Sequence, residues 1–182
     1  GAWIAGEIND HQYIEVDLGE IQPVYGVITK GRHGHQEWVK TYKVLYSRNG
    51  MAYAYVSEDG QEKIFSGNFD SETPVEHIFQ NPFEARFVRI QPITYYREIA
   101  LRMDFLGCGE GITTTPVYTT LGPKCIEEMG LARGMIKDEQ ITTSSSRYSN
   151  SDGRYIRLNT PQTDEHSGGW VAQDLDENQF VQ

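Results

Sequence analysis

The segment Gln12-Tyr-Ile-Glu-Val-Asp-Leu-Gly19 decides the fold class of this chain. Ile14, Val16 and Leu18 alternate with Tyr, Glu and Asp, so the apolar side chains would all point to one side of an extended backbone. A period of two residues is typical of a β-strand with one buried face. We expect Gly19 to end this strand, and the segment predicts a sheet rather than a helical fold.

Further short β-rich runs lie along the chain, separated by turn signals. The dipeptides Asn49-Gly50 and Asp59-Gly60 favour tight turns between strands. Several short strands with such turns indicate a sandwich or a barrel, and no stretch holds a sustained helical stripe. The strands that we expect cover residues 24–29, 39–46, 52–56, 86–91 and 99–106, with weaker candidates at 135–142 and 155–158.

Length, composition and charge restrict the possible classes of protein. The 182 residues suffice for one domain, or for one domain and a fragment. Aromatic residues make up 12% of the chain and charged residues 23%, which is enough apolar material for a folded core. The formal charge of −10, with Lys and Arg scattered singly, opposes binding to nucleic acid. No apolar run approaches a spanning helix and no basic leader opens the chain, so we expect a soluble piece.

The two ends of the chain resemble each other. The first fifteen residues, Gly1-Ala-Trp-Ile-Ala-Gly-Glu-Ile-Asn-Asp-His-Gln-Tyr-Ile-Glu15, align without a gap on Gly168-Gly-Trp-Val-Ala-Gln-Asp-Leu-Asp-Glu-Asn-Gln-Phe-Val-Gln182. Gly, Trp, Ala and Gln coincide, and most other positions match in kind. The alignment predicts a domain-sized repeat, with the chain beginning and ending in the middle of a repeat.

A linker separates the two halves of this arrangement. Residues 109–124 are rich in Thr, Gly and Pro and show no alternation, which favours a linker over a long surface loop within one domain. The domain organisation that we expect is therefore residues 1–108 as the end of one repeat, 109–124 as the linker and 125–182 as the start of the next.

Read in repeat order, from Cys125 to Gln182 and then from Gly1 to Cys108, the landmarks of the chain resemble the discoidin family, the C-type domains of coagulation factors V and VIII. The resemblance covers nearly all of the chain outside the linker. It rests on Met135-Ile-Lys-Asp-Glu-Gln-Ile-Thr-Thr-Ser-Ser-Ser146, Arg157-Leu-Asn159, the segment 12–19, Val27-Ile-Thr-Lys-Gly-Arg32, Trp38-Val-Lys-Thr-Tyr-Lys-Val-Leu-Tyr-Ser47, Ile64-Phe-Ser-Gly-Asn68, Ala85-Arg-Phe-Val-Arg-Ile-Gln-Pro92 and Ile99-Ala-Leu-Arg-Met-Asp-Phe-Leu-Gly-Cys108.

The resemblance implies an all-β, discoidin-type distorted jelly-roll β-sandwich whose ends are closed by a disulfide. It places Cys125 in the first cysteine position and Cys108 in the last, in successive repeats, so in the parent protein each would pair with a cysteine elsewhere. In this chain the two half-repeats would assemble one sandwich as a circular permutant, because closing a loop of linker length costs little. The alternative is two half-domains that do not pack, which would leave long open edges.

The resemblance also implies that ligands bind loops at one end of the sandwich. By position these loops are residues 147–153, 161–167 and 32–37, and their chemistry is polar. They predict an extracellular adhesion module for a glycan, a collagen-like matrix protein or another cell-surface protein. The ligand-binding residues that we expect are Tyr148, Ser149, Asn150, Asp152, Asp164, Arg32, His33, His35 and Gln36.

Three alternatives use the same loops. Binding to a phosphatidylserine membrane would need exposed apolar tips, whereas acidic residues dominate here. A metal-dependent hydrolase would use His33 and His35, but no third ligand is evident and no catalytic motif occurs. Asp152 and Asp164 are candidates for a calcium site, although charges on turns are usually only solvated. We therefore expect no enzyme activity, no metal and no cofactor.

The remaining conspicuous residues have structural interpretations. Trp3 and Trp170 are repeat equivalents and should anchor the core. We expect Arg86, Arg89 and Arg102 to pair with acidic residues across the sheet, whereas the role of Tyr95-Tyr96 is left open between packing and ligand contact. An extracellular location follows from the resemblance and the disulfide that it implies.

Overall fold

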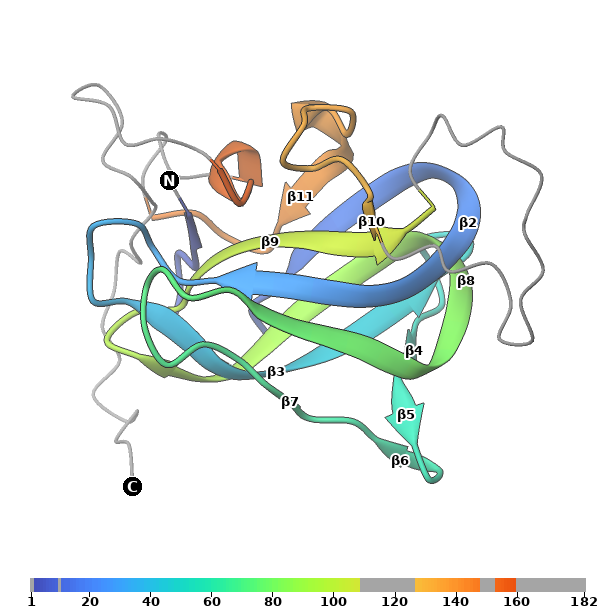
Figure 1. Cartoon of the computed structure of the whole chain (residues 1–182), viewed down its shortest axis with the longest axis horizontal. Helices are drawn as coiled ribbons and strands as arrows, with labels where there is room; N and C mark the ends of the chain where they lie inside the picture. Colours follow the sequence, from blue (N-terminus) through green and yellow to red (C-terminus); the bar gives the residue numbers. More distant parts are fainter. Residues whose placement is uncertain (1, 10, 109–126, 148–152, 160–182) are drawn as a thin grey trace.

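The computed structural model describes residues 2–9, 11–108, 127–147 and 153–159 (Figure 1). Nearly all regular structure in this part of the chain is β. The strands are β1 (Trp3–Ile4), β2 (Ile14–Lys30), β3 (Trp38–Ser47), β4 (Ala54–Tyr55), β5 (Ser57–Glu58), β6 (Gln61–Glu62), β7 (Phe65–Ser66), β8 (Val75–Tyr96), β9 (Ala100–Gly107), β10 (Glu127–Glu128) and β11 (Ile141–Thr143), with 3-10 turns η1 (Asp138–Gln140) and η2 (Gly153–Tyr155). Among these elements there is no helix that is long and apolar enough to cross a membrane.

Two long strands, β2 and β8, run through both layers of a sandwich. Their first contact, residues 14–17 of β2 against 87–90 of β8, lies in a layer with β11, β3, β4 and β7. Further on, residues 24–30 of β2 pair with β9, in a layer completed by β1, β10 and the start of β8. Figure 1 shows both strands curving over from one layer to the other. The expected all-β sandwich is confirmed.

Gly19 lies within β2 and does not end it, contrary to the expectation from sequence. The pairing of β2 with β8 shifts register between Asp17 and Gln22, which marks an irregularity where the strand turns between layers. Gly19 has a φ of 84°, a conformation that suits glycine, and its N–H donates to Asp17 Oδ1. Gly19, which the sequence predicted to end a strand, therefore lies at a bend within the strand.

The core forms where the inner faces of the two layers meet. The alternation from Ile14 to Leu18 is confirmed, because the three apolar residues of that segment are buried and the intervening ones are half-buried. Trp3 is fully buried, as expected for a core anchor. A row of stacked or edge-on aromatic pairs joins the layers through Tyr42, Phe65, Phe79, Phe83 and Tyr46.

Residues from the second half of the chain cover β9. Strand β10 pairs with β9 and β11 with β2, while the backbone of Ile156 accepts a hydrogen bond from Met103. Every residue of β9 is consequently buried, including Asp104, whose carboxylate accepts the N–H groups of Phe105 and Ala132. Burial raises the pKa of Asp104 to about 6. The division of the chain into two half-repeats stays a prediction, but the described parts of both halves share one core.

The weaker strand predictions in the second half are largely wrong. Of residues 135–142 only the last two are in a strand, β11, because η1 occupies residues 138–140. Residues 155–158 contain the end of η2 and a single bridge from Arg157 to Met103. These short segments pack onto strands formed by the first half of the chain and make few backbone pairs of their own. Their residues therefore do not show the alternation that predicts a strand.

Cys108 is disulfide-bonded, as the resemblance implied for this position. The other cysteine of the chain is Cys125, which lies outside the described residues, as do Trp170 and the whole linker at 109–124.

Candidate ligand-binding end

Three loops meet at one end of the sandwich because the strands that precede and follow them are antiparallel neighbours. Residues 31–37 join β2 to β3, residues 67–74 join β7 to β8, and residues 97–99 join β8 to β9. The pairs Lys30↔Arg102, Thr29↔Val75 and Trp38↔Tyr96 bring all three loops to the same edge. We call this group of loops the loop end.

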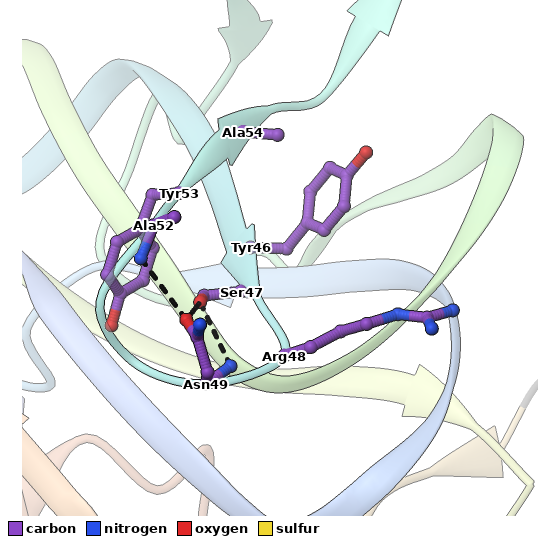
Figure 2. A pocket seen from close by; sticks show the side chains of 7 residues that line it. All are labelled: Tyr46, Ser47, Arg48, Asn49, Ala52, Tyr53 and Ala54. Carbon is purple, nitrogen blue, oxygen red and sulfur yellow. Dashed lines mark hydrogen bonds between the residues drawn. The ribbon is translucent and has the colours of Figure 1, made fainter.

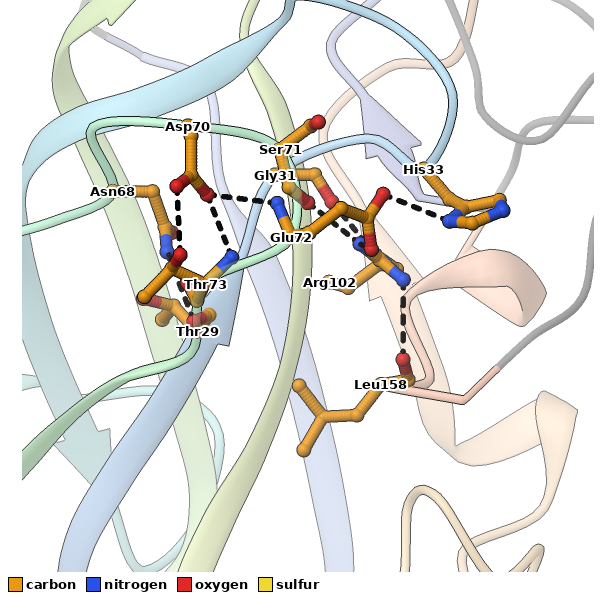
Figure 3. Close-up of polar contacts among 10 residues, drawn as sticks. All are labelled: Thr29, Gly31, His33, Asn68, Asp70, Ser71, Glu72, Thr73, Arg102 and Leu158. Atoms are coloured by element: carbon orange, nitrogen blue, oxygen red, sulfur yellow. Dashed lines mark hydrogen bonds and ion pairs between the residues drawn. The ribbon is translucent and has the colours of Figure 1, made fainter.

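Arg102 holds the loop end together (Figure 3). Its buried guanidinium donates to the carbonyl oxygens of Gly31 at 2.6 Å, Ser71 at 2.7 Å and Leu158 at 3.2 Å, and to Glu72 Oε2 at 3.1 Å. These acceptors come from two of the loops and from the second half of the chain. One planar side chain with five donors therefore fixes three segments that are distant in sequence. Arg102 does pair with an acidic residue, but Glu72 lies in a loop rather than across the sheet as expected, and most of the contacts of Arg102 are with backbone carbonyl oxygens.

The 67–74 loop is rigid in its own right. Asp70 accepts hydrogen bonds from the backbone of Glu72 and Thr73 and from the Thr73 hydroxyl. The Thr73 hydroxyl and these backbone donors hold the pKa of Asp70 below its ordinary value. Asn68 is buried and donates to the carbonyl oxygens of Thr29 and Thr73. Sequence reasoning did not include this loop in the site, although the Asn68 and Asp70 turn chemistry is visible in the sequence.

Phe69, at the tip of this loop, is 68% exposed. It lies between two rigid turn residues and is a large apolar side chain presented to solvent at the loop end. The expectation that the loop tips carry only polar chemistry is thus incomplete, because the loop that bears Phe69 was missed.

The structure brings the predicted residues of the 32–37 segment to this end, in different environments. His33 is half-exposed, and its Nδ1 lies 2.8 Å from Glu72 Oε1, which ties the two loops to each other. His35 is half-buried, and burial together with the neighbouring Arg32 cation lowers its pKa. Gln36 is exposed.

Arg32 is buried rather than presented to a ligand. Its side chain forms an ion pair with Glu37 at 2.7 Å, and its backbone N–H donates to the Glu37 carbonyl oxygen. A second pair, between Arg147 and Glu98 at 3.1 Å, lies at the same end, where burial raises the pKa of Glu98. Both pairs hold loops in place, and Arg147 is the first residue of the predicted loop 147–153.

An aromatic platform lies beside these loops. Trp38 and Tyr96 stack with their ring centroids 4.5 Å apart, and Tyr96 remains 40% exposed. Arg97, which has a positive φ of 61°, places its guanidinium 5.6 Å from the Tyr96 ring centroid. Tyr96 therefore contributes both to packing, through Trp38, and to the partly exposed surface, where Arg97 lies over its ring.

The remaining predicted site residues, Tyr148, Ser149, Asn150, Asp152 and Asp164, lie outside the described residues. Among the residues that the structure describes, no three His, Cys, Asp or Glu side chains gather as metal ligands. His33 pairs with Glu72, and the two histidines have no third partner of this kind within the described ranges. No observation therefore supports the hydrolase hypothesis.

Comparison with known proteins adds a family. The model of the F5/8 type C domain matches residues 1–105. Hemocytin of Bombyx mori is 36% identical over 87% of this chain but only 5% of its own length. Lactadherin of Mus musculus is 38% identical over 59% of this chain and 24% of its own length. The chain thus spans a quarter or less of these two relatives.

A solved structure shares the fold. Discoidin II of Dictyostelium discoideum superimposes with a TM-score of 0.52 and 25% sequence identity, covering 57% of this chain and 40% of the discoidin chain. The agreement extends the sequence match to the three-dimensional arrangement of the strands.

Proposed function

This chain belongs to the F5/8 type C domain family, and we propose that it is an extracellular recognition module that binds a glycan through the loop end of its β-sandwich. The partly exposed ring of Tyr96, which stacks on Trp38, carries the proposal. Sugar rings stack on flat aromatic faces, while neighbouring polar groups bind their hydroxyls. His33, Gln36 and Arg97 provide such groups within the same three loops.

Preorganisation supports a binding role for this end. Arg102 and the Asp70 turn hold the 31–37 and 67–74 loops in place without any ligand, so little conformational entropy would be lost on binding. The scaffold beneath is an ordinary packed core. Loops that are fixed by buried polar groups, while exposing other side chains, are suited to recognition rather than to catalysis.

The extracellular location is supported by the disulfide at Cys108, because disulfides persist in oxidising compartments. A collagen-like matrix protein or another cell-surface protein would use the same surface, and the assay below distinguishes these ligands from glycans.

Membrane binding is the second candidate function, and Phe69 is the observation that favours it. An exposed aromatic side chain at a loop tip would bury its ring in a lipid interface. Asp70 and Glu72 follow it in the same loop and would be repelled by anionic lipid, so this mode would favour neutral headgroups.

Paired variants test the two functions on the same chain. Tyr96→Ala removes the platform face and Phe69→Ser removes the apolar tip, and both sites are solvent-exposed. Binding to a glycan and matrix-protein array should fall about tenfold in Tyr96→Ala and remain unchanged in Phe69→Ser. Sedimentation with phosphatidylcholine and phosphatidylserine vesicles should detect no binding that depends on Phe69.

A double change, Tyr148→Ala with Asn150→Ala, tests the predicted first loop in the same array. Glycan binding that survives Tyr96→Ala, His33→Ala and this double change without loss would show that the loop end is not the site. If the array shows binding only to a matrix protein, the loop end would remain the proposed site but the ligand would not be a glycan.

A further inference from the structure

A hollow of about 360 Å³ lies at the end of the sandwich opposite the loop end (Figure 2). It is formed by the connection from β3 to β4. Strand β3 starts at the loop end with Trp38 and ends at Ser47, and its ten residues place the two ends about 30 Å apart. The volume falls at the lower end of the range for small-molecule sites. The hollow is therefore separate from the surface assigned above.

The backbone around the hollow is held by side chains of the same connection. Ser47 Oγ accepts the N–H groups of Asn49 and Gly50, and Asn49 Oδ1 accepts those of Met51 and Ala52. Four backbone donors in a short connection are thus satisfied internally.

Two tyrosines line the hollow, and each is held in place from behind. The Tyr46 ring stacks on Phe83 with centroids 4.1 Å apart and an interplanar angle of 16°. The Tyr53 hydroxyl donates to Glu15, and the Arg89 guanidinium lies 3.8 Å from the Tyr53 ring centroid. Neither ring has to be ordered on binding, which lowers the entropic cost of a contact with it.

Small side chains on the β4 side leave the hollow open, and larger side chains at the same positions would fill it. Ala54 pairs directly with Tyr46 across β3 and β4, so its methyl group lies beside the ring. Ala52 and Ala54 are both exposed and line the hollow. Phe83 stacks on one face of Tyr46, and the β4 residue that pairs with Tyr46 is an alanine, so the β4 side adds little side-chain bulk next to the ring.

Hydrogen-bond donors are available on the rim. Arg48 lines the hollow and is 63% exposed, and its ion pair with Glu84 is exposed at both ends. Such a pair is weak and exchanges readily for another partner. Asn49 also lines the hollow, and its side-chain amide nitrogen is a second donor.

We propose that this hollow is a second carbohydrate site, in which a single pyranose ring stacks on Tyr46 and its hydroxyls bind Arg48 and Asn49. An aromatic face, an apolar floor of methyl groups and a few polar donors match the alternating apolar and hydroxyl surfaces of a sugar. The proposal shares its ligand class with the proposed function but not its residues. A module with a sugar site at each end is able to bridge two glycans.

The test uses the whole chain, labelled with ¹⁵N, and neutral methyl glycosides of galactose, glucose and N-acetylglucosamine at millimolar concentration as probes. At least one glycoside should shift the amide signals of residues 47–54. Ala54→Trp fills the hollow without removing a packed side chain, and it should weaken this effect at least tenfold. Ser57→Trp, an exposed position on β5 that does not line the hollow, serves as the matched control and should leave the shifts intact.

The outcomes separate the two proposals. Shifts confined to residues 31–37, 67–74 and 96–98 would overturn the second site and leave the loop end intact. Two other results would also overturn it. One is that the shifts of residues 47–54 persist in Ala54→Trp. The other is that a decaproline peptide, used as a probe that is not a sugar, shifts these residues while none of the glycosides does. Loss of the loop-end shifts in Tyr96→Ala, with those of 47–54 retained, would show that the two sites are independent.

Discussion

Replacement of Arg102 by lysine tests whether one side chain organises the loop end. The guanidinium serves four acceptors, of which the Gly31 and Ser71 carbonyl oxygens lie in loops and the Leu158 carbonyl oxygen lies in the second half of the chain. Lysine keeps the positive charge but offers a single compact ammonium, which does not span acceptors arranged around a planar fork. We expect at least two of the three carbonyl oxygens to lose their donor in Arg102→Lys.

The size of the effect follows from burial. A buried acceptor that loses its partner costs about 1–3 kcal/mol, and partial entry of water reduces this value. Two such groups give an expected loss of about 2–4 kcal/mol in the free energy of unfolding. The loss should be concentrated at the loop end, because the aromatic row and the β2–β8 pairing do not contact Arg102.

Urea denaturation and hydrogen exchange measure the two parts of this prediction. Amide exchange should accelerate most in residues 31–37, 67–74 and 153–158, and in β3 by no more than the global loss of stability accounts for. The control is Arg86→Lys, because Arg86 is half-exposed and bonds Asp17 at the surface, so that variant should unfold like the parent. An Arg102→Lys protein as stable as the Arg86→Lys protein, with unaltered exchange in the loops, would refute the organising role of Arg102.

Three further substitutions probe the scaffold. Burial raises the pKa of Asp104 to about 6, so the Asp104 carboxyl binds a proton more readily in the folded state than in the unfolded chain. The free energy of unfolding should therefore rise by about 1.5 kcal/mol as the pH falls from about 7 to 5. Asp104→Asn should flatten this dependence of stability on pH, as measured by urea titrations. Gly50→Ala should cost more than Gly60→Ala in thermal melts, because both have positive φ but a Cβ at Gly50 would lie 3.3 Å from the Phe87 ring whereas Gly60 faces open space. Asn68→Asp turns a buried donor to two backbone carbonyls into an acceptor, and calorimetry should show a loss of about 2–4 kcal/mol with faster exchange in residues 67–74; an unchanged melting temperature would contradict the buried contacts.

Strand identity could be predicted from the sequence because alternation reports directly on burial. Residues 14–18 alternate, and the structure places their apolar residues in the core; the β-rich run 39–46 is also a strand, although its register shifts at Thr41. The continuation of β2 beyond Gly19 could not be predicted, because a glycine that ends a strand and one that bends it carry the same local signal. The short segments at 135–142 and 155–158 were misjudged for a related reason: their positions are set by contacts with β9 and β2 rather than by their own residue pattern.

The loop end could be predicted only in part. The family resemblance placed His33 and Gln36 in a loop at one end of the sandwich, and the structure has both exposed at the loop end. Arg32 looks the same in sequence, yet it is buried against Glu37, because an arginine that binds a ligand and one that holds a loop are not distinguishable without the fold. Phe69 was missed because the sequence predicted neither β7 nor the first part of β8, so the loop that joins them had no recognisable ends.

The distribution of charge at the loop end restricts the kind of ligand that it suits. Although the chain carries a net charge of −10, the charged groups here largely satisfy one another: Arg102 and His33 share Glu72, Arg32 binds Glu37, and Arg147 binds Glu98. Recruiting any of these groups to a charged ligand would break a contact that positions a loop. The groups outside these pairs are the Tyr96 ring with the Arg97 guanidinium over it, the Gln36 amide and the Phe69 side chain. These groups favour an uncharged partner with alternating apolar and hydroxyl surfaces, because a polyanion would gain too little Coulomb energy here to offset repulsion from the rest of the chain.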